Sequence, residues 1–382
     1  MNKLSPALLL ITTVISSYSY AQNQGHGASC IHEGVSEDIL SFNIHTTSVI
    51  GANSDREFEQ ALHHHDPAEE VDLQLIEFSL FSNLNTYTQL FSTYTVSEDR
   101  GALSGELEET YLRLHNLPHG FEVKAGRFIH NLGLQGNLHT HDWDFTHSDL
   151  TTALFLGEEG VSTDGAELNR YYIYDNYGVV GITLAHGKVT EPGEDGGFTD
   201  TVTTVRSTVH HYVDDFNQHF VGLSFAEGTN DFGRETKVVG LDYTYSWNAT
   251  SYEAQHATVD TSFQITNRNI QWQEGSQRGE SNQLAMLVSS IYNFSNNWSL
   301  GGRAEWIEGV DTPTSYQENE RFRLSAAVTR SFSLFHEEDS KIRLQYNYDE
   351  INGDLTTDNN HSLWLQFNFS IGTGWSPHKD HH

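Results

Sequence analysis

The sequence has little cysteine, little proline and little positive charge, and it lacks long hydrophobic runs. Its single cysteine, Cys30, excludes a disulfide framework and a cysteine-rich zinc module. Because 52 Asp and Glu outnumber 20 Lys and Arg, the formal net charge is −32, which argues against nucleic acid or anionic lipid as a binding partner. Beyond its N-terminal segment the chain contains no apolar run long enough for a membrane-spanning helix. A water-soluble β protein and a transmembrane β-barrel remain.

The N-terminal segment has the pattern of an export signal. Lys3 precedes an apolar run over residues 7–15, and small Ser19 and Ala21 stand where a signal peptidase cleaves. We therefore expect residues 1–21 to be a signal peptide and residues 22–37 to form an N-terminal periplasmic arm that carries Cys30 as a free thiol.

Alternation of apolar and polar residues dominates the rest of the chain. Between Leu363 and Ile371 every second residue is apolar and the intervening residues are mostly polar. Trp298 and Trp306 share a face, and the strand between them spans roughly 20 Å along a membrane normal, close to the height of an outer-membrane apolar band. A soluble sandwich also alternates, but Glu, Lys, Arg, Asn and Gln on the polar face of strand after strand indicate a water-filled lumen.

The count of such segments predicts the architecture. We expect an all-β, transmembrane, antiparallel up-and-down barrel over residues 38–372, similar to a porin, because closure removes the sheet edges that lipid cannot pair. A barrel of this strand number leaves an aqueous channel. The link over residues 247–257 is longer than the short turns expected at its end of the barrel, so the alternation defines the strand register least well there. The sixteen predicted strands are 39–50, 72–82, 85–96, 106–116, 120–130, 166–174, 178–187, 200–211, 217–226, 236–246, 258–271, 283–294, 297–308, 320–333, 340–350 and 360–371.

The longest segment without alternation covers residues 131–165, after the fifth predicted strand. By resemblance to general porins, whose third loop folds into the lumen, we expect it to form the pore constriction. Acidic loop residues facing basic wall residues would create a transverse field, and ordinary salt bridges that hold the loop are the alternative. The loop acids are Asp142, Asp144, Asp149, Glu158, Glu159 and Asp164, and the wall cations are Arg113, Lys124, Arg303, Arg323 and Arg343.

Histidine is abundant, with 22 residues, many of which are grouped and often stand beside a carboxylate. Imidazole and carboxylate are ligands of first-row divalent metals, zinc above all. Solvated polar loops are the alternative, and the spacing does not define a tetrahedral site. No cofactor is required by the pattern, but weak zinc binding is expected. The candidate metal ligands are His63, His64, His65, Asp66, His139, His141, Asp142, His147, His378, His381 and His382.

Motifs for catalysis are missing. The sequence holds no Gly-x-Ser-x-Gly elbow, phosphate-binding loop or HExxH helix. The adjacent Glu158 and Glu159 would point to opposite faces of an extended chain, so they form no carboxylate dyad. We therefore do not expect an enzyme.

A short stretch resembles a known family. Gly126-Arg127-Phe128, the residues around His139 and His141, and the run 156–160 with 164–165 resemble bacterial outer-membrane proteins called zinc-regulated outer-membrane receptors. The His-bearing tail 373–382 is also similar to that family. The resemblance implies a porin-type barrel in the outer membrane of a Gram-negative bacterium and a link to zinc. It supplies no ligand residues.

Together these patterns predict an outer-membrane channel for passive diffusion of small hydrophilic solutes, with divalent metal or its complexes as the preferred cargo. One alternative is an anion-preferring porin that uses the lumenal Arg and Lys. Another is a non-conducting surface barrel that binds metal or a partner through acidic, His-rich loops. The expected partners are outer-membrane lipid and lipopolysaccharide, small solutes or metal ions, and two further copies of the chain in a homotrimer, but not nucleic acid.

Overall fold

The computed structural model describes residues 40–55, 66–67, 70–99, 102–157, 160–174, 178–193, 196–251, 254–294, 297–308, 320–334, 337–352 and 357–372. Within these ranges no helix is long and apolar enough to cross a membrane. The expected signal peptide, N-terminal arm and His-bearing tail lie outside the described residues.

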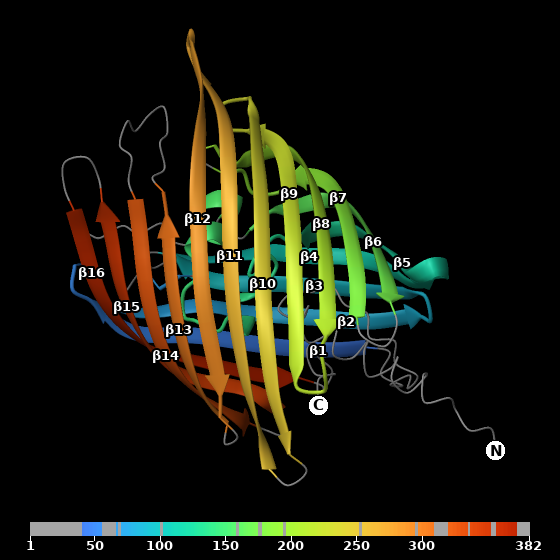
Figure 1. Ribbon diagram of the computed structural model, residues 1–382, viewed down its shortest axis with the longest axis vertical. Helices are drawn as coiled ribbons and strands as arrows, with labels where there is room; N and C mark the ends of the chain where they lie inside the picture. Colours follow the sequence, from blue (N-terminus) through green and yellow to red (C-terminus); the bar gives the residue numbers. More distant parts are fainter. Residues whose placement is uncertain are drawn as a thin grey trace.

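Sixteen antiparallel strands form one closed barrel in which each strand pairs with its neighbours in sequence (Figure 1). The ring closes between the first and last strands, from Asn43 opposite Gly372 to Asn53 opposite Ser362. The strands are β1 Leu40–Asn53, β2 Val71–Asn85, β3 Thr88–Asp99, β4 Ala102–Leu117, β5 Phe121–Ile129, β6 Ser162–Tyr174, β7 Gly178–Val189, β8 Phe198–Tyr212, β9 Asn217–Asn230, β10 Glu235–Ser251, β11 Ala254–Glu274, β12 Gln277–Asn293, β13 Trp298–Ile307, β14 Glu320–Leu334, β15 Glu337–Asn352 and β16 Thr357–Gly372. The predicted fold class and strand count are confirmed.

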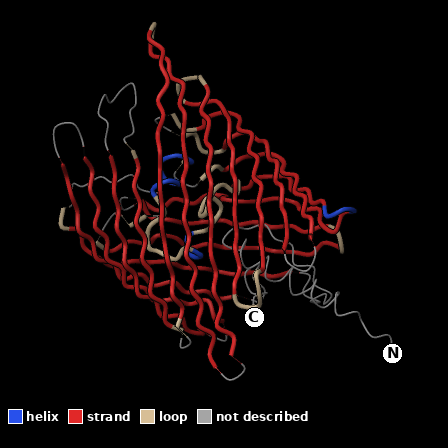
Figure 2. Tube along the Cα trace, in the orientation of Figure 1, coloured by secondary structure: helices blue, strands red, loops and turns tan. Residues whose placement is uncertain are grey.

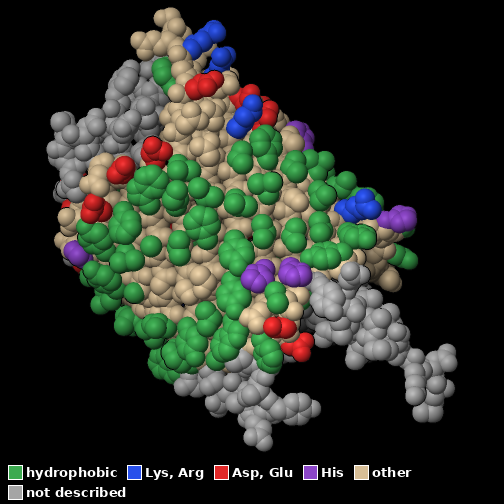
Figure 3. Space-filling model, viewed as in Figure 1, with side chains coloured by type: hydrophobic (Ala, Val, Ile, Leu, Met, Phe, Trp, Pro, Cys, Tyr) green, Lys and Arg blue, Asp and Glu red, His purple; other side chains and the backbone are tan. Residues whose placement is uncertain are grey.

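The polar face of each strand points inward, as the alternation predicts. On β15, inward Gln345 and Asn347 are fully buried, whereas outward Leu344 is 47% exposed. On β13 the half-buried Trp306 and exposed Trp298 share the outer face with exposed Leu300. Hydrophobic side chains cover the middle of the visible outer surface, and charged side chains gather toward its ends (Figure 3). Soluble proteins bury apolar side chains and expose polar ones, whereas this barrel does the opposite. Such an apolar exterior is stable in a hydrocarbon environment.

The connections divide the barrel into two ends. The turn end holds the start of β1, the end of β16 and short connections such as the single turn Pro118–Gly120 between β4 and β5. The loop end holds the longer connections, including residues 130–161 between β5 and β6. Two loop-end connections are nevertheless tight, because β3 pairs with β4 up to Asp99 opposite Ala102 and β11 pairs with β12 up to Glu274 opposite Gln277.

The expected long link over residues 247–257 is wrong. Strands β10 and β11 continue pairing to Ser251 opposite Ala254, so this stretch is a long hairpin at the turn end. The alternation of the sequence weakens there because residues 248–251 are all small or polar. Backbone pairing alone extends the ladder beyond the apolar band.

A charge on the outer face at mid-height tests the lipid-facing assignment. Replacing Leu344 by Arg is expected to destabilise the barrel in lipid vesicles by about 2–4 kcal/mol, because the guanidinium enters hydrocarbon. Glu350→Arg, on the same face near the loop end, is expected to cost about 0–1 kcal/mol. Urea titration of the two refolded variants measures both values, and equal costs would contradict the assignment.

Candidate functional site

The segment between β5 and β6, residues 130–161, lies inside the barrel and is called the inward loop below. Its two helical turns, Thr140–Asp142 and Thr152–Leu156, sit within the ring of strands (Figure 2). The buried residues of the loop include Leu132, Trp143 and Phe155. The loop therefore narrows the lumen, which is the geometry that a constriction requires.

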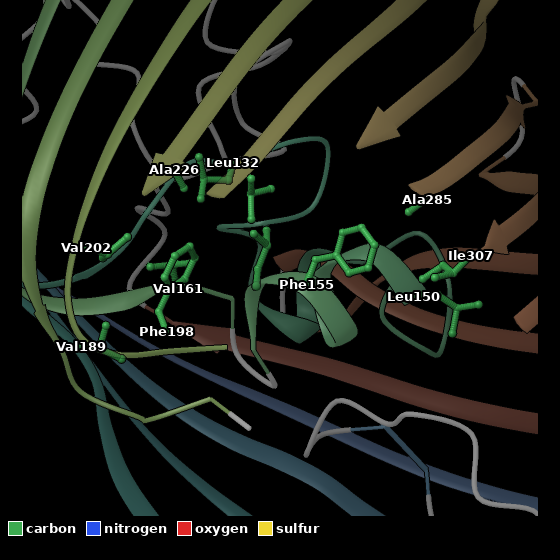
Figure 4. Packing of buried hydrophobic residues seen from close by; sticks show 12 residues of the cluster. Leu132, Leu150, Phe155, Val161, Val189, Phe198, Val202, Ala226, Ala285 and Ile307 are labelled. Atoms are coloured by element: carbon green, nitrogen blue, oxygen red, sulfur yellow. The ribbon is translucent and has the colours of Figure 1, made fainter. Parts of the chain in front are cut away.

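An apolar cluster fixes one side of the inward loop to the wall (Figure 4). Phe155 and Leu150 are fully buried and pack with Ala285 of β12 and Ile307 of β13. The cluster continues over the other loop residues Leu132, Leu156 and Val161 and the wall residues Val189, Phe198, Val202, Ala226 and Val238. Burial of these side chains gives the loop a small hydrophobic core of its own inside an otherwise polar lumen.

Polar wall side chains bind the backbone of the inward loop. Glu305 accepts the amide of Leu150 at 2.7 Å, and Gln264 accepts the amide of Leu134 at 2.7 Å. Gln345 accepts the amide of Thr146 at 2.7 Å, and Asp66, from the connection between β1 and β2, accepts the amide of Ser148 at 2.8 Å. An irregular buried chain needs such partners, because it has no ladder to satisfy its amides.

Four wall arginines donate to carbonyl oxygens of the same loop. They come from β11, β13, β14 and β15, so they reach the loop from one side of the barrel. The shortest of these bonds join Arg343 Nη2 to the Trp143 oxygen at 2.6 Å and Arg268 Nη1 to the Leu154 oxygen at 2.7 Å. Arg303 donates to the oxygens of His147 and Ser148 at 3.2 Å each, and Arg323 donates to the Ser148 oxygen at 3.3 Å.

The expected pairing of loop acids with wall cations is not what the structure shows. Of the predicted cations, Arg343 bonds to Thr329, Gln366 and the loop carbonyl, and the others pair with carboxylates of the wall itself. These wall pairs are Arg113–Glu122 at 2.6 Å, Lys124–Glu167 at 3.2 Å, Arg303–Glu305 at 2.9 Å and Arg323–Asp349 at 2.7 Å. The arginines that reach the loop donate hydrogen bonds to its backbone carbonyl oxygens.

The predicted loop acids have different surroundings. Asp149 is buried and caps the helical turn, accepting from the Thr152 amide at 2.7 Å, and Asp144 is exposed inside the barrel. Asp164 belongs to β6 and points outward, where Arg127 binds it at 2.9 Å, so its expected place in the constriction is wrong. Asp164 lies within β6 rather than in the loop, and the alternation of that strand directs its side chain outward. Glu158 and Glu159 lie outside the described residues.

A gap remains between the inward loop and the wall formed by β11, β12 and β13. It encloses about 50 Å³. Asp144 and Asp149 line it from the loop side, and Asp260 and Arg303 line it from the wall side, with Ser262 and Ser289 between them. Since Arg303 is paired with Glu305, the fixed charge of the gap is negative. Small cations are the solutes that such a gap favours.

Among the described histidine ligands that were predicted, His147 lies apart from His139 and His141. His147 lies beside Gln345, Asn347 and Trp364, with no carboxylate contact among the described residues. Burial, with nearby Arg323 and Arg303, lowers the pKa of His147 well below its ordinary value, so its ring is neutral. His63, His64, His65, His378, His381 and His382 lie outside the described residues. Asp66 contacts Ser148, as above, rather than a histidine of the described chain.

His139 and His141 instead enter a buried group of carboxylates that β2 and β4 contribute. His139 Nδ1 lies 3.0 Å from Glu77 Oε2 and 3.2 Å from Glu108 Oε2, and its Nε2 lies 3.2 Å from Glu109 Oε2. His141 Nδ1 lies 3.1 Å from the same Glu77 oxygen. Burial lowers the pKa of His139, but the Glu108 and Glu77 carboxylates outweigh burial and raise it well above the ordinary value.

Sequence reasoning missed the three glutamates of this group. The alternation could have placed Glu77 in the lumen, since it stands on the polar face of its strand, directly opposite His45 in register. It could not have placed both Glu108 and Glu109 there, because simple alternation directs one of two adjacent residues outward. A β-bulge in β4, where Thr93 opposes Glu109 and Tyr94 opposes Leu107, turns both side chains inward.

Comparisons with known proteins agree on the fold. No model of a known protein family matches the chain. A relative described as an uncharacterized protein of Aquifex aeolicus (strain VF5) is 27% identical over 204 residues, which cover 47% of this chain and 42% of the relative. The chain thus matches less than half of that relative's length, and the match assigns no function.

Solved structures with a similar fold are outer-membrane proteins. An anion-selective porin from Comamonas acidovorans has a TM-score of 0.54 and 9% identity, with 87% of this chain and 99% of that chain covered. The channel DcaP of Acinetobacter baumannii has a TM-score of 0.53 and 9% identity, over 86% and 96% of the two chains. OmpT of Vibrio cholerae, in a trimer form, has a TM-score of 0.50 and 10% identity, over 86% and 99%. At such low identity these likenesses establish the barrel architecture alone.

Removing the phenylalanine that the inward loop contributes to the apolar cluster tests how the loop is held. Phe155→Ala is expected to weaken loop docking by about 3–5 kcal/mol, because the substitution leaves a cavity that the rigid wall cannot close. Chymotrypsin should then cut the loop near Trp143 and Phe145 at least about a hundredfold faster, in proportion to the opened population. Phe216→Ala, at an exposed turn-end position, serves as the control. Equal cleavage of both variants would show that the cluster does not hold the loop.

Proposed function

We propose that this protein is a porin-like channel of a bacterial outer membrane through which small hydrophilic solutes diffuse passively, with a preference for cations. The observation that carries the proposal is the acidic gap between the inward loop and the wall of β11, β12 and β13. Asp144, Asp149 and Asp260 bring three carboxylates to the gap, whereas its one lining cation, Arg303, is paired with Glu305. A negative constriction attracts cations and repels anions.

The anion-preferring alternative has less support. It requires lumenal Arg and Lys to present uncompensated charge to the pore. Four of the five predicted cations are paired with wall carboxylates, and Arg343 donates into the backbone of the loop. Their charge is therefore largely neutralised or turned toward the protein. The net charge of −32 also disfavours the entry of anions.

Divalent metal ions, zinc among them, are the cargo that we favour within this function. Acidic residues concentrate divalent cations, and exchangeable oxygen ligands permit release. The apolar outer face supports insertion into the outer membrane, beside lipid and lipopolysaccharide. We further propose a homotrimer, for which the trimer form of the Vibrio cholerae neighbour is a precedent. The non-conducting surface barrel remains an outcome of the test below.

Planar-bilayer recording of the refolded barrel under a salt gradient tests the channel. We expect a reversal potential that shows cation preference. The double variant Asp144→Asn, Asp260→Asn is expected to lower the cation-to-anion permeability ratio roughly tenfold or more, because each carboxylate contributes on the order of 1 kcal/mol at a partly screened distance. Asp164→Asn removes one charge from the outer face and is the matched control.

Three results would contradict the proposal. Absence of conductance would favour the surface barrel, and anion preference in the unmodified barrel would favour the alternative porin. A permeability ratio that changes as much in Asp164→Asn as in the double variant would show that overall charge, rather than the gap, sets the preference.

A further inference from the structure

The buried carboxylate and histidine group lies apart from the conducting gap, against β2 and β4 rather than β11 to β13. Glu77, Glu108 and His139 each bring one ligand atom within 4.8 Å of the other two, and all three residues are buried. We propose that these three side chains bind one divalent transition-metal ion, zinc in the first place, and that this ion joins the inward loop to β2 and β4.

The spacing of the ligand atoms fits a tetrahedral ion. Zinc takes imidazole nitrogen and carboxylate oxygen at about 2.0–2.2 Å, so two ligand atoms at a tetrahedral angle lie roughly 3.3 Å apart. His139 Nδ1 lies 3.0 Å from Glu77 Oε2 and 3.2 Å from Glu108 Oε2. One N–H cannot point at both oxygens, whereas one ion between the three atoms contacts all of them.

The surrounding side chains orient the ligands as they do in known metal sites. Glu109 Oε2 lies 3.2 Å from His139 Nε2, on the ring nitrogen that faces away from the proposed ion, and Glu109 Oε1 accepts the Ile129 amide at 3.0 Å. Ser79 donates to the remaining oxygen of Glu77 at 2.5 Å. A carboxylate behind a metal-binding histidine fixes its tautomer and raises its basicity.

Charge balance also calls for a cation. Glu77, Glu108 and Glu109 are at most 7% exposed, and none forms an ion pair with a Lys or Arg in the described parts of the chain. Their charged neighbours are His139 and His141, with Asp142 adding a further carboxylate 3.5 Å from His141. Glu108 Oε2 receives no hydrogen bond of acceptable geometry from a described residue. Buried carboxylates this close repel one another unless a positive charge lies between them.

A second group, His45, Glu77 and His141, is a poorer site. The His45 and His141 rings stack with centroids 3.9 Å apart and planes 8° from parallel. Imidazole lone pairs lie in the ring plane, so the lone pairs of stacked rings run side by side rather than converge on one ion. His45 Nδ1 is also engaged by Ser370 Oγ at 2.8 Å. The proposal therefore rests on the group around His139.

Zinc counting on full-length protein tests the site. To remove the other histidine clusters, His63, His64, His65, His378, His381 and His382 are first changed to Ala in one parent variant. This parent is refolded in detergent, stripped with chelator and then equilibrated with zinc by dialysis. It is expected to bind one zinc ion per chain tightly. Glu108→Gln and His139→Gln on the parent are each expected to lose it. Glu109→Gln should weaken it about 10–100-fold, because the histidine loses its orienting partner.

His130→Gln is the matched control, since His130 is equally buried at the start of the inward loop but contacts Thr163 and Thr204 instead of carboxylates. It is expected to keep the zinc. A parent that binds no tight zinc, or Glu108→Gln and His139→Gln variants that bind it like the parent, would overturn the proposal.

Cobalt binding to the unmodified protein provides a second measurement that depends on no substitution. Co²⁺ is expected to give the intense visible absorption of a four-coordinate ion, displaced by one equivalent of zinc, and absence of that absorption would also overturn the site. The test of the metal site is independent of the test of conduction. A barrel that does not conduct but binds zinc at this site would contradict the proposed channel and support the proposed metal site.

Discussion

The inward loop depends on one constraint: an irregular chain inside a barrel must find a partner for every buried amide and carbonyl. The wall supplies these partners from side chains rather than from a ladder, with Glu305 and Gln345 accepting from the loop and Arg303 and Arg343 donating to it. Much of the polar inner face is thereby committed to holding the loop. In the proposed channel, selectivity would therefore depend on the charged residues that border the gap.

Most of the barrel was predictable because strand alternation has a fixed period and lipid enforces it. Leu344 and Gln345, or Leu241 and Asp242, differ in polarity for the simple reason that one faces hydrocarbon and the other the lumen. Strand ends were less predictable, as at Ser251 and Ala254, where backbone pairing continues although the sequence no longer alternates. The inward course of the loop was expected by resemblance, and its apolar core was not.

A signal for that core was nevertheless present in the strands. Val238 stands next to Val239, and Trp306 next to Ile307, so both faces are apolar at the loop end of β10 and β13. Inward apolar residues in a polar lumen mark where a loop docks. The carboxylate group around His139 had a weaker signal, because its geometry depends on the bulge at Glu108 and on a loop whose path is set by contacts far apart in sequence.

That bulge makes chain length, and not only residue identity, part of the information in β4. Glu108 is the extra residue between two stretches that pair in register with β3. Loss of the Glu108 codon would bring the two stretches into one uninterrupted pleat in which Leu107 still faces outward and Glu109 still faces inward, because Thr93 and Tyr94 would keep their partners. Only the second buried carboxylate would be lost. The barrel wall could therefore be encoded by one codon fewer, and the additional codon in β4 serves to place Glu108 beside Glu109 rather than to close the sheet.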